Sequence, residues 1–441
     1  MKKTGIRLTV VFILLIDSLG ISAQTQHDSM LNTLMQQEKW FDVQVYLSQN
    51  RDSISEMYYL VAKSFLDTYF NRPESSLTHI GALLNKYSKE LGGTFDFAIL
   101  MMKNLAEVQK YDEAINILNE ILRQTGDALP QEWKDNLNMA LSGFESVKER
   151  PTQIIFSEND QSKIPFEMQL AGIGVNSKVN GVDLQAIFDT GSSINRMSKE
   201  TADRMGIHSY LPDTIYADNV RFLRGIIDSI EIGNIKIYNL LANVALERPN
   251  LPVSQEAKEI VFSFVDSALN NNVLLGIETI KKIDIINVDF INKYISFEEA
   301  TSEIQQLGNI FIIDNRIYLQ TLLNNQPFTS IFDTGYSVGT FLNKDYYERY
   351  RAYFSFKDEQ QHIDRSFYND ALDTIEYKNL NDIVLTNYNN RFNFSNVMVA
   401  INRPFTYTDN YPVLDGIIGN DFLKLLKNMR LDFKNMCITF E

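Results

Sequence analysis

Apolar residues in the first third of the chain recur at intervals of three and four, the spacing of one buried helix face. One such set is Met57, Leu60, Val61, Phe65 and Leu66, and another is Ala114, Ile117, Leu118, Ile121 and Leu122. Pro73 and the Gly92-Gly93 pair interrupt these patterns as turns between helices. The periodicity therefore predicts an all-α domain of helical hairpins over residues 24–150.

Beyond Pro151 the pattern changes to short apolar runs separated by Asn, Asp and Gly. Runs of this length with turn residues between them are typical of β-strands joined by hairpins. We therefore expect a multidomain protein in which an all-α part precedes an all-β part.

The β part contains one motif twice. Residues 187–191 and residues 331–335 both read Ile-Phe-Asp-Thr-Gly. A polar turn precedes each copy, Asn180-Gly181 in the first and Asn324-Asn325 in the second. These turns predict two hairpins, each of which delivers an aspartate onto a tight glycine turn.

A second element repeats at a matched distance. Gly276 follows an apolar run 87 residues after Asp189, and Gly419 follows another 86 residues after Asp333. Two matched motifs at matched separation are far more specific than one short motif. The β part is therefore predicted to be a duplicated pair of lobes, 151–300 and 301–441, with acidic residues between them.

Two aspartates in duplicated surroundings suit one chemistry in particular. Carboxyl groups held close together cannot both ionise easily, so one keeps a proton while the other acts as a base. Asp189 and Asp333 are thus predicted to activate a water molecule that hydrolyses a peptide bond. With four His and one Cys in the chain, we expect no metal and no other cofactor.

The two Asp-Thr-Gly turns, each with its later glycine element, resemble those of the pepsin-like aspartic peptidases. The stretch from Asp415 to Leu423 is also similar to retropepsin-like proteins of bacteria. The resemblance covers residues 160–441 and implies an all-β, bilobal, pepsin-like protease domain. It further implies a cleft between the lobes that binds a peptide or protein substrate in extended conformation.

The same resemblance implies supporting roles around the two aspartates. Thr190 and Thr334 would each hydrogen-bond to the turn of the opposite lobe, and Ser192 would donate to Asp189. Tyr336 stands in place of that serine in the second lobe, which is a departure from the pattern. The glycines at these turns would allow close backbone approach, and they are Gly191, Gly335, Gly276 and Gly419.

A substrate flap is expected between the two motifs of the first lobe. Tyr216 precedes a turn and an apolar strand pattern that ends at Gly233, a spacing similar to that after the flap tyrosine of pepsin-like enzymes. An ordinary strand tyrosine is the alternative for Tyr216.

The helical part loosely resembles tetratricopeptide hairpins between Phe97 and Leu122. Such hairpins often present a groove to a protein partner, and packing on the β part is the alternative role.

The first 23 residues read as a signal peptide. Lys2 and Lys3 precede an apolar run that is too short for a membrane anchor, and Ala23 supplies a small residue for cleavage. We expect a bacterial protein that is periplasmic or secreted and has no transmembrane anchor once the signal is removed. The net charge of −15 argues against nucleic acid as a partner.

Two functions follow from these patterns. The first is an aspartic endopeptidase that uses Asp189 and Asp333. The alternative is a non-catalytic peptide-binding or adaptor protein, in which a degenerate protease fold clamps a peptide and the helical domain recognises a partner.

Overall fold

The computed structural model describes most of the chain, namely residues 25–91, 95–125, 128–157, 163–207, 215–217, 220–246, 259, 266, 268–300, 308–337, 339–356, 362–366, 373–394, 397–401 and 414–441. The chain divides into two compact units, one that ends at Pro151 and one that runs from Thr152 to Glu441. The predicted signal peptide lies outside the described residues.

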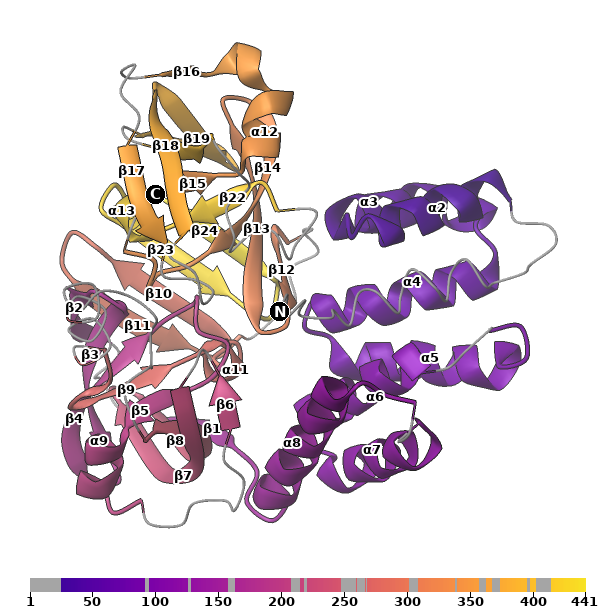
Figure 1. Ribbon diagram of the computed structural model, residues 1–441, viewed down its shortest axis with the longest axis horizontal. Helices are drawn as coiled ribbons and strands as arrows, with labels where there is room; N and C mark the ends of the chain where they lie inside the picture. The colour runs from indigo at the N-terminus through magenta and orange to yellow at the C-terminus, as the bar shows by residue number, and fades with distance from the viewer. Residues whose placement is uncertain are drawn as a thin grey trace. The chain divides into compact units, whose positions relative to one another are not determined.

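The first unit is helical, as predicted, and successive helices pack against one another. Figure 1 shows these helices at the indigo end of the colour bar. Their bounds are α2 (Gln26–Gln36), α3 (Trp40–Asn50), η1 (Arg51–Ser53), α4 (Glu56–Tyr69), α5 (Pro73–Tyr87), α6 (Phe95–Glu107), α7 (Tyr111–Thr125) and α8 (Gln131–Val147).

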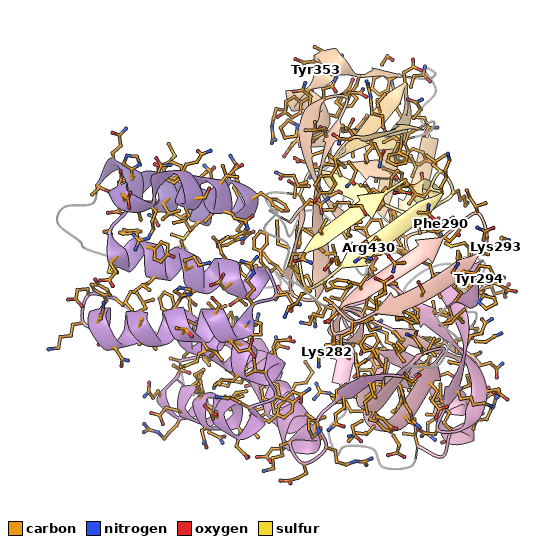
Figure 2. All side chains as sticks on the ribbon, turned by 180° about the vertical axis from the view of Figure 1, so that it is seen from behind. Lys282, Phe290, Lys293, Tyr294, Tyr353 and Arg430 are labelled. Carbon is orange, nitrogen blue, oxygen red and sulfur yellow. The ribbon has the colours of Figure 1, made fainter. Side chains whose placement is uncertain are left out.

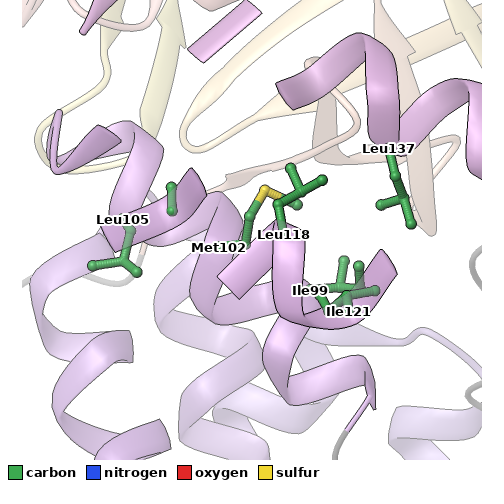
Figure 3. Close-up of a cluster of buried hydrophobic side chains, with 7 residues drawn as sticks. Ile99, Met102, Leu105, Leu118, Ile121 and Leu137 are labelled. Carbon is green, nitrogen blue, oxygen red and sulfur yellow. The ribbon is translucent and has the colours of Figure 1, made fainter. Parts of the chain in front are cut away.

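Apolar stripes hold the last three of these helices together. Met102 of α6, Leu118 of α7 and Leu137 of α8 are buried in one cluster, which Figure 3 shows from close by. Each stripe recurs at helical spacing, so burial of one face orients all three helices. Of the helices that the structure describes, none combines the length and apolarity needed to cross a membrane.

The second unit is rich in β-strands, also as predicted, and it consists of two similar halves. The elements of the first half are β1 (Gln153–Phe156), β2 (Ile164–Gln169), β3 (Gly172–Val179), β4 (Val182–Phe188), β5 (Arg196–Ser198), α9 (Lys199–Arg204), β6 (Ile215–Ala217), β7 (Val220–Ile232), β8 (Ile235–Ala245), β9 (Asn272–Leu275), α11 (Ile277–Ile280), β10 (Ile285–Asp289) and β11 (Tyr294–Glu298).

The second half repeats much of this order. Its elements are β12 (Ile310–Ile313), β13 (Arg316–Leu323), β14 (Gln326–Phe332), β15 (Phe341–Leu342), α12 (Lys344–Arg349), η2 (Arg351–Tyr353), β16 (Ser355–Phe356), β17 (His362–Ser366), β18 (Asp373–Asn381), β19 (Ile383–Asn387), β20 (Asn390–Phe394), β21 (Val397–Ala400), β22 (Gly416–Ile418), α13 (Asn420–Leu423), β23 (Asn428–Asp432) and β24 (Cys437–Phe440).

The two predicted hairpins are confirmed, and their turns share one geometry. Asn180 and Gly181 join β3 to β4, and Asn324 and Asn325 join β13 to β14. All four residues have positive φ, between 47° and 80°. Two consecutive left-handed residues are the signature of a type I′ turn, whose twist matches that of the paired strands.

Four antiparallel strands at one end of a thirteen-stranded sheet join the two halves, and β11 continues this sheet by pairing with β2. Their central pair is β10 of the first half with β23 of the second, flanked by β11 and β24 (Figure 1). One face of this sheet is buried through Val288, Ile295 and Leu431. The other face is polar and carries Tyr294 and Arg430, which Figure 2 labels. Alternation of buried and polar residues along these strands therefore fixes which face meets the core.

The outer edge of β24 is closed by side-chain amides. Asn309 donates from Nδ2 to the carbonyl of Ile438 (2.9 Å) and accepts from its amide (2.8 Å). Asn387 and Asn390 donate to the carbonyls of Ile438 and Phe440. Because an open edge leaves backbone groups unpaired, these asparagines replace a missing neighbouring strand.

We predict that Asn309→Ala destabilises the β unit by about 1–3 kcal/mol, because the buried amide of Ile438 loses its acceptor. Chemical denaturation of both proteins measures the difference in the free energy of unfolding. Asn389→Ala, at an exposed turn residue, is the matched control. Equal stability of the Asn309 and Asn389 variants would contradict this assignment.

Candidate active site

The two predicted aspartates stand at equivalent places in the two halves. Asp189 follows β4, which runs parallel to β9, and its amide donates to the carbonyl of Leu275 (3.1 Å). Asp333 follows β14, which runs parallel to β22, and its amide donates to the carbonyl of Ile418 (3.0 Å). Each aspartate thus leaves its sheet at the end of a strand that is paired on both sides.

The two threonines link the turns of the two halves by four reciprocal hydrogen bonds. The hydroxyl of Thr190 donates to the carbonyl of Phe332 (2.8 Å) and accepts from the amide of Thr334 (2.9 Å). The hydroxyl of Thr334 donates to the carbonyl of Phe188 (3.1 Å) and accepts from the amide of Thr190 (3.1 Å). Both threonines are buried, so removal of either hydroxyl leaves its backbone partners without a hydrogen bond in a place that water does not reach.

The glycines of the two turns make room for the opposing carboxyl groups. A Cβ atom on Gly191 would stand 2.2 Å from the carboxyl of Asp333, and one on Gly335 would stand 2.5 Å from Oδ1 of Asp189. The amides of these glycines also donate to the aspartate of their own turn, each at 2.9 Å. The structure therefore brings both carboxyl groups together, each lying against the turn of the other half.

Gly276 and Gly419 lie beneath the two turns. A Cβ atom on Gly276 would stand 2.5 Å from the carbonyl oxygen of Ile194, and one on Gly419 would stand 2.7 Å from that of Tyr336. Only glycine allows the backbone to approach so closely. These two positions therefore support the loops that follow the aspartates.

The prediction that the hydroxyl of Ser192 donates a hydrogen bond to Asp189 is wrong. The hydroxyl of Ser192 donates instead to the carbonyl of Ile194 at 2.8 Å. A hydroxyl carries a single proton, so this bond within the loop excludes donation to the carboxylate. Tyr336, its counterpart in the second half, is 8% exposed.

The environment raises the pKa of both carboxyl groups. Burial is the largest cause for Asp189, and the charge of Asp333 raises its pKa further, against the amide of Gly191 and the charge of Arg196. Burial also raises the pKa of Asp333, against the amides of its own turn and the charge of Arg316. The pair therefore retains a proton at a higher pH than an isolated aspartate would.

Tyr216 lies in a β-hairpin, and its role as a flap residue stays a prediction. It pairs with Arg221 where β6 and β7 run antiparallel. Residues 218 and 219, which lie between β6 and β7 in the sequence, are outside the described residues.

The sequence did not reveal Asn195, which braces the first active-site loop. Its side chain is fully buried, accepts from the amide of Gly276 (3.0 Å) and donates to Glu278 (2.7 Å). The second half has glycine at the equivalent position, and there Thr340 donates to Asp421 (2.9 Å). A comparison of the two repeats residue by residue, at the offset of 144 that relates their aspartate turns, would have drawn attention to this difference.

Metal ligation has no support in the described part of the chain. His, Cys, Asp and Glu side chains there form no group of three or more that could hold an ion.

Residues 175–282 match a protein-family model described as gag-polyprotein putative aspartyl protease. The matched segment contains Asp189 and Gly276. This part of the chain is similar to retropepsin-like aspartyl proteases. The predicted resemblance to retropepsin-like proteins is thereby confirmed for the first half of the β unit.

Solved structures similar to the chain include a retropepsin-like aspartic protease from Rickettsia conorii, at 18% identity and a TM-score of 0.20. That match covers 33% of this chain and 90% of the other. Another is the EIAV protease complexed with an inhibitor, at 15% identity and a TM-score of 0.18, covering 28% of this chain and 92% of the other. A comparison with curated proteins found no match.

We predict that Thr190→Val destabilises the β unit by about 2–4 kcal/mol, because the carbonyl of Phe332 and the amide of Thr334 both lose a partner in a buried site. Thr439→Val, on the polar face of the joining sheet, makes the same chemical change away from the turns. Denaturant unfolding followed by circular dichroism compares the two. The prediction fails if both variants unfold at the same denaturant concentration.

A second prediction concerns stability and pH. A carboxyl group whose pKa is raised by folding stabilises the fold at low pH, and this contribution is lost as the pH rises through the raised pKa. Asp189→Asn keeps the acceptor for the amide of Gly191 but cannot ionise. Its melting temperature should therefore exceed that of the wild type increasingly as the pH rises above about 4, the ordinary value for aspartate.

Thermal unfolding of both proteins across this pH range tests the idea, with Asp382→Asn at an exposed turn as the matched control. A constant difference between Asp189→Asn and the wild type at every pH would show that burial of the pair imposes no cost on its ionisation.

Proposed function

We propose that the β unit is an aspartic endopeptidase whose catalytic groups are Asp189 and Asp333. The observation that supports this most is the reciprocal arrangement in which each carboxyl group lies against the glycine of the opposite turn. Two carboxyl groups so placed, with raised pKa values, share a proton and hold one water molecule between them.

In the proposed reaction the ionised carboxylate takes a proton from the water as it attacks the carbonyl carbon of the peptide bond. The protonated carboxyl group donates a hydrogen bond to the carbonyl oxygen, on which negative charge develops. The carboxyl group that took the proton from water then passes it to the leaving nitrogen as the C–N bond breaks, which completes hydrolysis. The pair acts as one unit, so the proton belongs to neither aspartate alone.

The arrangement of the halves supports a bilobal, pepsin-like reading of the protein. Both turns come from one chain, and the sheet of β11, β10, β23 and β24 holds the halves together. We propose that substrates bind between the halves as extended strands and that the β6–β7 hairpin with Tyr216 covers them as a flap.

Other parts of the proposal rest on the sequence. The basic and apolar residues 1–23 support export to the periplasm or beyond the cell of a bacterium. The helical unit, with its loosely tetratricopeptide-like hairpins, would recognise a protein partner or substrate.

The decisive experiment is cleavage of an unfolded protein by the purified chain. We expect fragments from the wild type, inhibition by pepstatin, and a loss of activity on the order of 10³-fold in Asp189→Asn and in Asp333→Asn. Asp382→Asn is the matched control and should cleave normally. If the wild type binds unfolded chains but neither it nor the variants cleave them, the protein is a peptide clamp.

We also predict a bell-shaped dependence of activity on pH. Activity falls at low pH, where both carboxyl groups are protonated, and at high pH, where both are ionised. Because the pKa of both groups is raised, the high-pH limb should lie well above about 4, the ordinary pKa of aspartate. Measuring kcat/KM between acidic and mildly alkaline pH with one peptide checks this. Activity that is already lost near the ordinary value would contradict the raised pKa values.

A further inference from the structure

One peptide group of the first half connects Asp189 to a buried side chain. Its carbonyl, that of Leu275, accepts from the amide of Asp189 (3.1 Å). Its N–H, that of Gly276, donates to Oδ1 of Asn195 (3.0 Å). Because a peptide group is planar and stiff, the placement of the Asn195 side chain constrains the backbone from which Asp189 projects.

The side chain of Asn195 has one orientation that satisfies all its partners. Nδ2 donates to Oε1 of Glu278 (2.7 Å) and to the carbonyl of Leu241 (2.9 Å), while Oδ1 accepts from Gly276. A flipped amide would point its two donors at the N–H of Gly276. Asn195 is fully buried, so water cannot replace any of these bonds.

Glu278 adds a charge to this arrangement. Its Oε1 atom accepts both from Nδ2 of Asn195 and from the backbone amide of the same residue (3.1 Å). Hydrogen bonds to an ionised carboxylate are roughly twice as strong as neutral ones. The bonds from Glu278 through Asn195 and the peptide group of Gly276 to Asp189 form a continuous chain, and bonds in such a chain strengthen one another.

The second half is built differently at the same place. The amide of Asp333 donates to the carbonyl of Ile418 as its counterpart does, but the residue equivalent to Asn195 is Gly339, which has no side chain. Asp421, the equivalent of Glu278, accepts instead from the hydroxyl of Thr340 (2.9 Å). An asparagine side chain therefore braces the supporting peptide group of the first half, and Gly339 offers none to that of the second.

We propose that Asn195 and Glu278 are positioning residues that hold Asp189 in its reactive orientation toward Asp333. This inference rests on the proposed peptidase function and gives the two halves unequal parts in it. The amide of Gly191 donates to Oδ1 of Asp189 (2.9 Å) and belongs to the same turn, so a displaced backbone weakens this bond as well.

The first test is Asn195→Ala. We expect kcat to fall on the order of tenfold with KM nearly unchanged, because Asn195 is fully buried and cannot contact a substrate. The amide of Gly191 lowers the pKa of Asp189 against the larger effect of burial, so a poorer bond should move the pH profile of kcat to higher pH. A mere loss of folded protein would lower the rate without moving the profile.

Variants of Glu278 separate its charge from its hydrogen bonds. Glu278→Gln keeps the acceptor and should stay within about threefold of the wild type, whereas Glu278→Ala should resemble Asn195→Ala. Asn195→Asp sets two carboxylates against each other and should be impaired. Adding Glu278→Gln to it should restore part of the activity, because an amide then faces a carboxylate again and Gly276 keeps its acceptor.

Asn309→Ala is the matched control, since it makes the same chemical change at another buried asparagine that serves backbone groups. It should lower stability and leave kcat and its pH profile unchanged. Carbon-13 NMR of labelled aspartate carboxyl groups, assigned with Asp189→Asn, measures the titration of Asp189 in the folded chain without any substrate. Asn195→Ala should raise its apparent pKa, and Asn309→Ala should not.

The proposal is overturned if Asn195→Ala matches Asn309→Ala in kcat, pH profile and titration, or if the double variant is no better than Asn195→Asp. If Asn195→Ala does not fold, the same comparison is made with Glu278→Ala against Glu278→Gln, and equal behaviour of these two overturns it. A wild-type chain that cleaves nothing would refute the proposed function. The titration of Asp189 would then still decide whether Asn195 positions this carboxyl group.

Discussion

The whole β unit depends on the reciprocal hydrogen bonds of Thr190 and Thr334. Each hydroxyl serves the backbone of the opposite half twice, once as donor and once as acceptor, in a site from which water is excluded. These bonds place the two carboxyl groups relative to each other, and the joining sheet holds the halves at the distance that the bonds require. Neither half alone could satisfy its own threonine, so the geometry of the site is a property of both halves together. Stability and chemistry are thus coupled at the same four bonds.

The site also makes ionisation of the two aspartates unfavourable in free energy. Burial raises the pKa of two neighbouring acids, and the chain limits the penalty with amides of the glycine turns and with arginines at a distance. Glycine is required at each turn for two reasons that reinforce one another, since its amide serves one carboxyl group and its missing side chain admits the other. A group that is costly to ionise is also a group that holds a proton where the proposed hydrolysis needs one.

Much of this could be predicted from the sequence, because the relevant signals were local and occurred twice. The hairpin turns, Asp189, Asp333 and the supporting glycines all lie within or near repeated motifs, and the helical periodicity of the first unit was clear. Other features depend on which strands become neighbours in the sheet. Local sequence patterns do not predict this pairing. The hydroxyl of Ser192 donates a hydrogen bond to a carbonyl of its own loop. Asn195 and Asn309 form hydrogen bonds with backbone groups that are far away in the sequence. Arg196 and Arg224 share a face of the sheet because β8 lies between their strands. These contacts depend on the pairing of strands that are distant in the sequence, and only the structure shows that pairing.

The two halves share a backbone plan and differ in side chains at matched positions. At an offset of 144 residues, Gly172 corresponds to Arg316, Ser192 to Tyr336 and Arg196 to Thr340. An assembly of two identical subunits would present the same groups on both sides of its axis, and a peptide could then lie across it in either orientation at equal free energy. In this chain the sides are chemically distinct, so the amino and carboxyl ends of a bound strand are no longer interchangeable. Duplication within one polypeptide therefore gives the site a polarity.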